Sequence, residues 1–184
     1  MSNVAFIAAQ VLAGLVVFVS LHELGHVLMA RAFGDRDARF TLIGRRRGQW
    51  IVATTQTRYA DVDTWEGVKV ALAGPLFTRL IAEVLALGLL LMAVPDVWLP
   101  FLLTVFVLSR TDFWLYTVRD FVMVYLARQP LPGRDIADAA RWGSVLVGST
   151  PGRLFALLLG VSTADLLLGW PRAVAVLSGS GGLS

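Results

Sequence analysis

Cysteine is missing from this 184-residue chain, and histidine nearly so. Without cysteine the chain can form no disulfide bond, no thiolate metal site and no cysteine nucleophile. The only two histidines are His22 and His26, and the only lysine is Lys69. A zinc site that uses both histidines must therefore take a third protein ligand from a carboxylate.

Charged residues are also scarce, at 16% of the chain against 57% hydrophobic residues, and the mean hydropathy is +0.70. This apolar share exceeds that of soluble domains and predicts an integral membrane protein. The chain is long enough for one compact unit, without a separate soluble domain. The net charge of +3 could suggest a nucleic-acid partner. We expect none, because the arginines cluster in loops between apolar runs and are typical of topology signals.

Four apolar runs predict an all-α membrane protein with spanning helices at about residues 4–32, 64–93, 101–127 and 152–170. The first run is too long for a signal-peptide core and lacks a basic leader, so we expect it to be retained. Pro171 should bend or end the fourth helix. The prediction is a single polytopic domain over residues 1–177, followed by a disordered Ser/Gly-rich tail at 178–184.

Two shorter elements are expected outside the spans. Strand-like runs at 39–44 and 49–55, joined by an Arg-Arg-Arg-Gly turn, predict a β-hairpin between the first two helices. An irregular basic loop is the alternative. A proline-broken loop at 128–135 precedes a short amphipathic helix at 135–146.

Arginine placement predicts the orientation in the membrane. Arginines crowd residues 31–58 and recur at residues 127–141, whereas the turn at 94–100 and the N-terminal tip have none. By the positive-inside rule, the hairpin and the proline loop are cytoplasmic and both termini lie outside. The expected location is the inner membrane of a bacterial or archaeal cell.

The sequence His22-Glu23-Leu24-Gly25-His26 carries the strongest functional signal. Histidines at positions i and i+4 of a helix share one face and can bind one Zn²⁺, and Glu23 beside them is a candidate general base. Polar groups inside a spanning helix usually mark function. The alternative is a chance match, with both histidines hydrogen-bonded inside the bundle. His26 would lie about 9 Å from the cytoplasmic end of its helix, which places the metal in the cytoplasmic third of the membrane.

Six carboxylates are candidates for the third ligand: Glu83, Asp112, Asp120, Asp135, Asp138 and Asp165. Asp135 is favoured because it begins a helix on the same side as the motif, after a turn that can re-enter the protein core. Its ordinary role would be that of an N-cap. Asp112 comes next, and Asp138 or Asp120 follow.

Two candidates lie at depths where arginines also occur. The predicted interhelical ion pairs are Glu83 with Arg110 and Arg79 with Asp112, because charges inside a membrane usually pair. Asp120, next to Arg119, is expected to face solvent or a partner. Asp165 is expected to lie too far toward the outer side for the metal.

Three segments together resemble the site-2 proteases, a family of intramembrane zinc metalloproteases. They are the His-Glu-Leu-Gly-His motif in a membrane helix, Ala73-Gly74-Pro75 opening a later helix, and the proline-rich run that ends in Asp135. The resemblance covers about residues 4 to 140 and is that of a small member without a peptide-binding insert domain. It implies zinc ligation by His22, His26 and Asp135, with Glu23 activating water. It also implies a hairpin that helps to position an unwound substrate strand.

Several positions differ from the family pattern. Thr78 stands where an asparagine is usual, Ile136 and Ala137 stand where glycines are usual, and the asparagine before the proline loop is absent.

The leading hypothesis is an intramembrane zinc endopeptidase that cleaves a membrane-spanning substrate near the cytoplasmic side. The alternative is a catalytically inactive membrane subunit, derived from the family, that binds and stabilises a larger membrane complex. A transporter or channel is a distant third.

Overall fold

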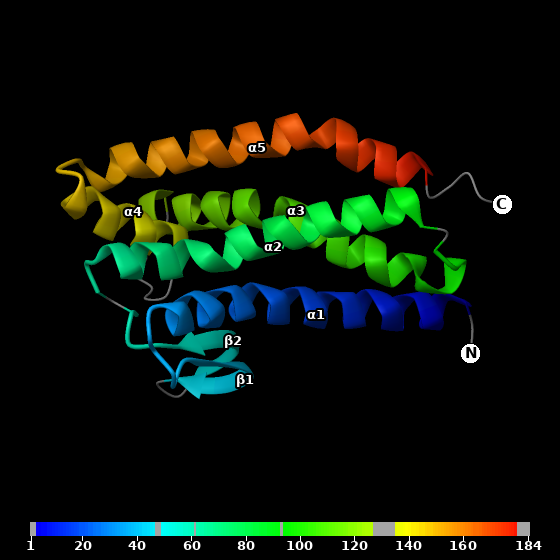
Figure 1. Ribbon diagram of the computed structural model, residues 1–184, viewed down its shortest axis with the longest axis horizontal. Coiled ribbons are helices and arrows are strands. Elements are labelled where there is room, and N and C mark those ends of the chain that lie inside the picture. Colours follow the sequence, from blue (N-terminus) through cyan, green and yellow to red (C-terminus); the bar gives the residue numbers. More distant parts are fainter. Residues whose placement is uncertain (1–2, 47–48, 61, 93, 127–134, 180–184) are drawn as a thin grey trace.

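The described part of the chain contains four long helices, the short helix α4 (Asp135–Leu146) and a small two-stranded sheet (Figure 1). The computed structural model describes residues 3–46, 49–60, 62–92, 94–126 and 135–179. The elements in chain order are α1 (Asn3–Ala32), β1 (Arg39–Arg46), β2 (Gln49–Gln56), α2 (Trp65–Leu91), η1 (Asp96–Trp98), α3 (Leu99–Phe121), η2 (Val122–Leu126), α4 (Asp135–Leu146) and α5 (Pro151–Gly179).

The four long helices are each long and apolar enough to cross a membrane. Large apolar side chains on their outer faces are exposed, for example Leu12 on α1, Leu87 on α2 and Leu168 on α5. Such exposure suits a surface that faces lipid rather than water. The predicted fold class is confirmed: an all-α membrane protein with four spanning helices and a β-hairpin between the first two.

The helices lie roughly side by side, with α1 on one side of the α2–α3 pair and α5 on the other (Figure 1). The short helix α4 packs between α2 and α5. The hairpin and α4 lie at one end of the bundle, and α1 begins and α5 ends at the other (Figure 1). The orientation in the membrane, with both termini outside and the hairpin on the cytoplasmic side, stays a prediction.

Glycines allow α1 and α2 to approach each other closely. A Cβ atom added to Gly25 would lie 2.6 Å from the carbonyl oxygen of Ala73, and one added to Gly74 would lie 2.4 Å from His26 Nε2. Neither distance is possible for a real side chain, so both positions need glycine. In membranes, small residues at helix crossings bring backbones together in this way. The crossing sets the two histidines directly against α2.

The hairpin is antiparallel, with Arg39 opposite Gln56 and Ile43 opposite Val52. Its base is tied to the end of α1. The Asp35 carboxylate accepts hydrogen bonds from the Thr57 hydroxyl and the Arg58 backbone N–H, both at 2.8 Å. These contacts hold the sheet beside α1. The antiparallel pairing of β1 with β2 confirms the predicted hairpin and excludes the irregular loop.

Helix α5 continues through Pro171 and ends at Gly179, so of the two predicted effects of this proline, a bend or an end, the end is excluded. Proline removes one intrahelical hydrogen bond, but ending the helix in a membrane would leave several more backbone groups without partners. Of the predicted disordered tail, Ser178 and Gly179 belong to the helix, and residues 180–184 lie outside the described part of the chain. The predicted proline loop at 128–134 also lies outside it. The third span finishes as the π-helical turn η2 rather than as α-helix.

The ion pairs within the spans differ from the predicted ones. Asp165 on α5 lies 2.8 Å from Arg79 on α2 and 2.8 Å from Arg110 on α3, and Arg79 also pairs with Glu83. Arg79 and Asp165 lie equally far along helices that both begin at the hairpin end (Figure 1). Asp165 is therefore the partner of two intramembrane arginines, a role that the sequence analysis did not assign to it. The network joins α2, α3 and α5 through opposite charges, as intramembrane charges require.

Candidate metal centre

His22 and His26 lie on the face of α1 that packs against α2 and α3. Their side chains are almost wholly buried, at 1% and 5% exposure. The Nε2 atoms of the two rings are 3.2 Å apart. The i, i+4 spacing therefore does bring both imidazoles to one point, as the sequence predicts.

The other nitrogen of each ring has a defined partner. His22 Nδ1–H donates to the Asp112 carboxylate at 2.7 Å, and His26 Nδ1–H donates to the Val70 carbonyl oxygen at 2.6 Å. Because both acceptors face Nδ1, the protons belong there and the lone pairs of both Nε2 atoms point at the shared centre. Metal-binding histidines are typically oriented in this way by a carboxylate or a carbonyl oxygen.

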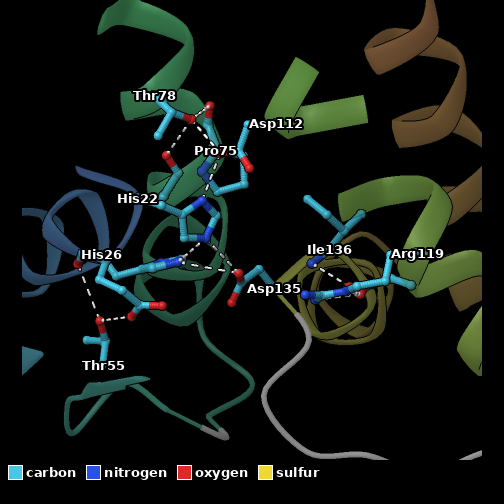
Figure 2. Close-up of polar contacts among 12 residues, drawn as sticks. His22, His26, Thr55, Pro75, Thr78, Asp112, Arg119, Asp135 and Ile136 are labelled. Carbon is cyan, nitrogen blue, oxygen red and sulfur yellow. Dashed lines mark hydrogen bonds and ion pairs between the residues drawn. The ribbon is translucent and has the colours of Figure 1, made fainter. Parts of the chain in front are cut away.

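Asp135 faces the same centre from the first residue of α4. Its Oδ2 atom lies 3.2 Å from His22 Nε2 and 3.4 Å from His26 Nε2 (Figure 2). Three ligands at zinc bond lengths in a tetrahedral arrangement are separated by about 3.3 Å from each other. The donor set and its spacing therefore fit a zinc ion, and the site is one of possible metal binding.

Asp112 is close to this centre but lies on the far side of the His22 ring (Figure 2). Its Oδ2 atom also accepts a hydrogen bond from the Thr78 hydroxyl, and its Oδ1 atom is buried without a partner among the described residues. The predicted pair of Asp112 with Arg79 is wrong. Asp112 was also the second candidate for the third zinc ligand. Its carboxylate instead orients the His22 ring and is not among the three ligand atoms that converge on the centre.

Asp120 is fully buried and does not face solvent, which corrects its predicted placement. Its Oδ2 atom accepts hydrogen bonds of 3.1 Å from the backbone N–H groups of Ile136 and Ala137, and Oδ1 pairs with Arg119. Asp120 thus satisfies the first free N–H groups of α4, the task that an N-cap performs. The side chain of Asp135, freed from this task, can face the histidines.

The remaining carboxylate candidates lie elsewhere. Asp138 lies 3.8 Å from Arg141 on α4, and Glu83 and Asp165 belong to the ion-pair network. Asp138 does line the cavity beside the centre, but the three ligand atoms that converge are those of His22, His26 and Asp135.

The glycine of the Ala-Gly-Pro segment, Gly74, lies directly against the two histidine rings. A Cβ atom on Gly74 would lie 2.4 Å from His26 Nε2 and 2.8 Å from His22 Nε2. Any side chain here would therefore occupy the space of the imidazoles. The glycine gives the two rings room on the surface of α2.

A cavity of about 360 Å³ opens beside the centre. Its wall includes Glu23 and His26 from α1, Thr55 from β2, Tyr116 from α3 and Asp135 from α4. The volume is within the range of ligand-binding pockets. Glu23, the predicted base, therefore shares a cavity with two of the residues that converge on the centre.

Sequence reasoning missed Tyr116, whose ring stacks on His22 with centroids 4.4 Å apart. The Arg119 guanidinium lies 4.2 Å from the centre of the same ring. A signal was present in the sequence: Asp112, Tyr116 and Asp120 recur every four residues along a membrane-spanning helix. That spacing predicts one polar stripe facing the protein interior.

The fold and this centre together define an integral membrane protein with a His-His-Asp cluster between its helices. Comparison with protein families identifies the class more closely. The model of peptidase family M50 matches residues 10–162. The chain therefore belongs to peptidase family M50, the site-2 protease family, whose members are zinc metalloproteases. Searches of curated proteins and of solved structures give no match.

Proposed function

We propose that the protein is an intramembrane zinc endopeptidase that cleaves a membrane-spanning protein substrate. One observation carries the proposal: three ligand atoms, from His22, His26 and Asp135, converge at zinc-ligand spacing within reach of a cavity that Glu23 lines. Family membership supports the same chemistry.

The ligands would be His22, His26 and Asp135. Zinc bound there would polarise the scissile carbonyl and lower the pKa of the attacking water. Glu23 would take a proton from the attacking water and pass it to the leaving amine, as a general base and then a general acid. Asp112 and the Val70 carbonyl hold the two imidazoles in the tautomer that leaves Nε2 free.

A spanning substrate must unwind before it can be cut, because helical hydrogen bonds hide its carbonyl groups. Pairing with a strand can replace those hydrogen bonds. Ala53, Thr54 and Thr55 of β2 line the cavity beside Glu23, which supports a role of the hairpin in holding an unwound segment.

We further propose that cleavage occurs near the cytoplasmic side of a bacterial or archaeal inner membrane, with both termini outside. His26 lies in the last third of α1, toward the end of the bundle that carries the hairpin (Figure 1). The arginines of the hairpin region support a cytoplasmic position for that end.

The test compares the wild-type protein with Glu23→Gln in lipid vesicles that also hold a library of single-span peptides. Cleavage products are identified by mass spectrometry, and zinc is measured in both proteins. We expect products only with the wild type and equal zinc in both, because the amide cannot accept the proton. Equal cleavage by Glu23→Gln would contradict the proposal.

A second candidate is an inactive membrane subunit that stabilises a larger complex. It is supported by Thr78, which stands where the family usually has asparagine and whose hydroxyl is used in binding Asp112. In that case the wild-type protein would hold zinc, cleave none of the peptides and purify together with a membrane partner.

A further inference from the structure

The hairpin makes a direct contact with the predicted base. The Thr55 hydroxyl donates a hydrogen bond to Glu23 Oε2 at 2.6 Å and lies 3.3 Å from the Glu23 backbone oxygen (Figure 2). Both side chains are half-buried and line the same cavity. Among the described residues, Thr55 is the only one that hydrogen-bonds the Glu23 carboxylate.

An unusual backbone conformation accompanies this contact. Ala53 has φ of 60°, in the left-handed region that residues with a Cβ seldom adopt. Side chains of a regular strand alternate between two faces, yet Ala53, Thr54 and Thr55 all line the cavity. The left-handed conformation of Ala53 interrupts the regular strand at this point. Strain of this kind is often kept at functional sites.

The contact occupies only one oxygen of the carboxylate. Glu23 Oε2 is held by Thr55, whereas Oε1 has no hydrogen-bond partner in the described part of the chain. A general base needs one free oxygen, in a fixed direction, to receive a proton. The arrangement satisfies both needs, because the held oxygen fixes the plane of the carboxylate and the other remains available.

We infer that Thr55 is a positioning residue that orients Glu23 for proton transfer. The inference rests on the proposed protease function and extends it to the hairpin. Since the donor belongs to β2, the base is oriented only while the hairpin stays docked against α1. The Asp35 contacts with Thr57 and Arg58 maintain that docking. The hairpin thus contributes to catalysis as well as to holding the substrate.

The test uses the full-length protein in detergent with dye-labelled casein, an unfolded probe whose peptide bonds need no prior unwinding. Thr55→Val removes the hydroxyl and keeps the shape, and Thr55→Ser keeps the hydroxyl. Thr41→Val is the matched control, because Thr41 lies on β1 opposite Thr54 and does not line the cavity. Zinc content is measured for each protein.

We expect kcat of Thr55→Val to fall about 10- to 100-fold, the usual loss when a supporting partner of an active-site group is removed. KM and zinc content should be unchanged, and both Thr55→Ser and Thr41→Val should have nearly wild-type kcat.

Three results would overturn the inference. They are an unchanged kcat in Thr55→Val, an equal loss in Thr55→Ser, or a rise in KM alone, which would indicate a purely structural role of the hairpin. A wild-type protein no faster than Glu23→Gln would instead overturn the proposed function itself. The two failures are therefore distinguishable.

Discussion

Asp112 on α3 holds the His22 ring from the side opposite the candidate metal, through a 2.7 Å hydrogen bond to Nδ1. The two residues come from different helices and are 90 positions apart. Thr78 on α2 hydrogen-bonds the same carboxylate oxygen. One buried chain of hydrogen bonds thus joins α1, α2 and α3 at a candidate zinc ligand, His22.

Asp135→Ala should abolish stoichiometric zinc binding, because it removes one of three converging ligand atoms. Metal content of the purified protein, measured by mass spectrometry, checks this. Asp138→Ala is the control, since it removes a carboxylate one turn further along α4. Zinc retained in Asp135→Ala and lost in Asp138→Ala would move the third ligand to Asp138.

Asp112→Asn should weaken zinc binding about 10- to 100-fold without abolishing it, as is usual when the partner of a metal-binding histidine is changed. The amide keeps the size of the side chain but can turn its NH₂ group toward His22 and disturb the tautomer. Competition with a chelator of known affinity measures the change. Complete zinc loss would indicate that Asp112 is itself a ligand.

Gly74→Ala should lower both zinc content and thermal stability, because its Cβ would lie 2.4 Å from His26 Nε2. Gly88→Ala is the matched control on the same helix, since a Cβ there meets nothing within 4 Å. The control should be neutral or more stable by up to about 1 kcal/mol, the difference in helix propensity. Equal behaviour of the two variants would show that α2 does not lie against the histidines.

Asp165→Ala should lower the free energy of unfolding by about 3 kcal/mol, the usual result of leaving a buried charge without its partner. Asp165 is the residue on α5 that pairs with Arg79 and Arg110, and the Arg110 side chain is only 4% exposed. Thermal unfolding in detergent measures the loss. Zinc content should not change, because the network shares no residue with the metal centre. A stable Asp165→Ala would show that α5 is held by apolar packing alone.

The base of the hairpin should loosen in acid. The Arg58 backbone N–H and then the Thr57 hydroxyl stabilise the ionised carboxylate and lower the pKa of Asp35 below its usual value. A lowered pKa in the folded state adds stability at pH above about 4, the value in an unfolded chain, and this stability is lost as pH falls through the folded-state pKa. Hydrogen exchange of β1 and β2, compared with Asp35→Asn, checks this. The variant should exchange fast at neutral pH and lack the acid-dependent step.

Much of the fold could be predicted because it depends on local patterns. Apolar runs located the four spans, alternating β-branched residues located the hairpin, and the Asp135–Leu146 helix has the predicted bounds. Thr64 caps α2 by accepting a hydrogen bond from the Gly67 N–H, a local interaction typical of a threonine at this position. These features rest on hydrogen bonds and burial within a few residues of each other.

The partners of the intramembrane charges could not be predicted. The depth of each charge was counted along its own helix, but pairing also depends on how helices are rotated and on which helix lies beside which. Asp165 reaches Arg79 and Arg110 because α5 packs against α3, a contact between distant parts of the chain. Asp120 is buried for a similar reason, since α4 folds back over its side chain.

The sequence by itself determined that this is a membrane protein, where its helices and hairpin lie, and that His22, Glu23 and His26 share one helix, because hydropathy and the helical repeat act locally. Only the tertiary structure decided that Asp135 meets the histidines while Asp112 stands behind one of them, and that Thr55 reaches Glu23. Those relationships join α1 to residues 32 to 113 positions away. They depend on helix rotation and on close approach at Gly74, which no local pattern encodes.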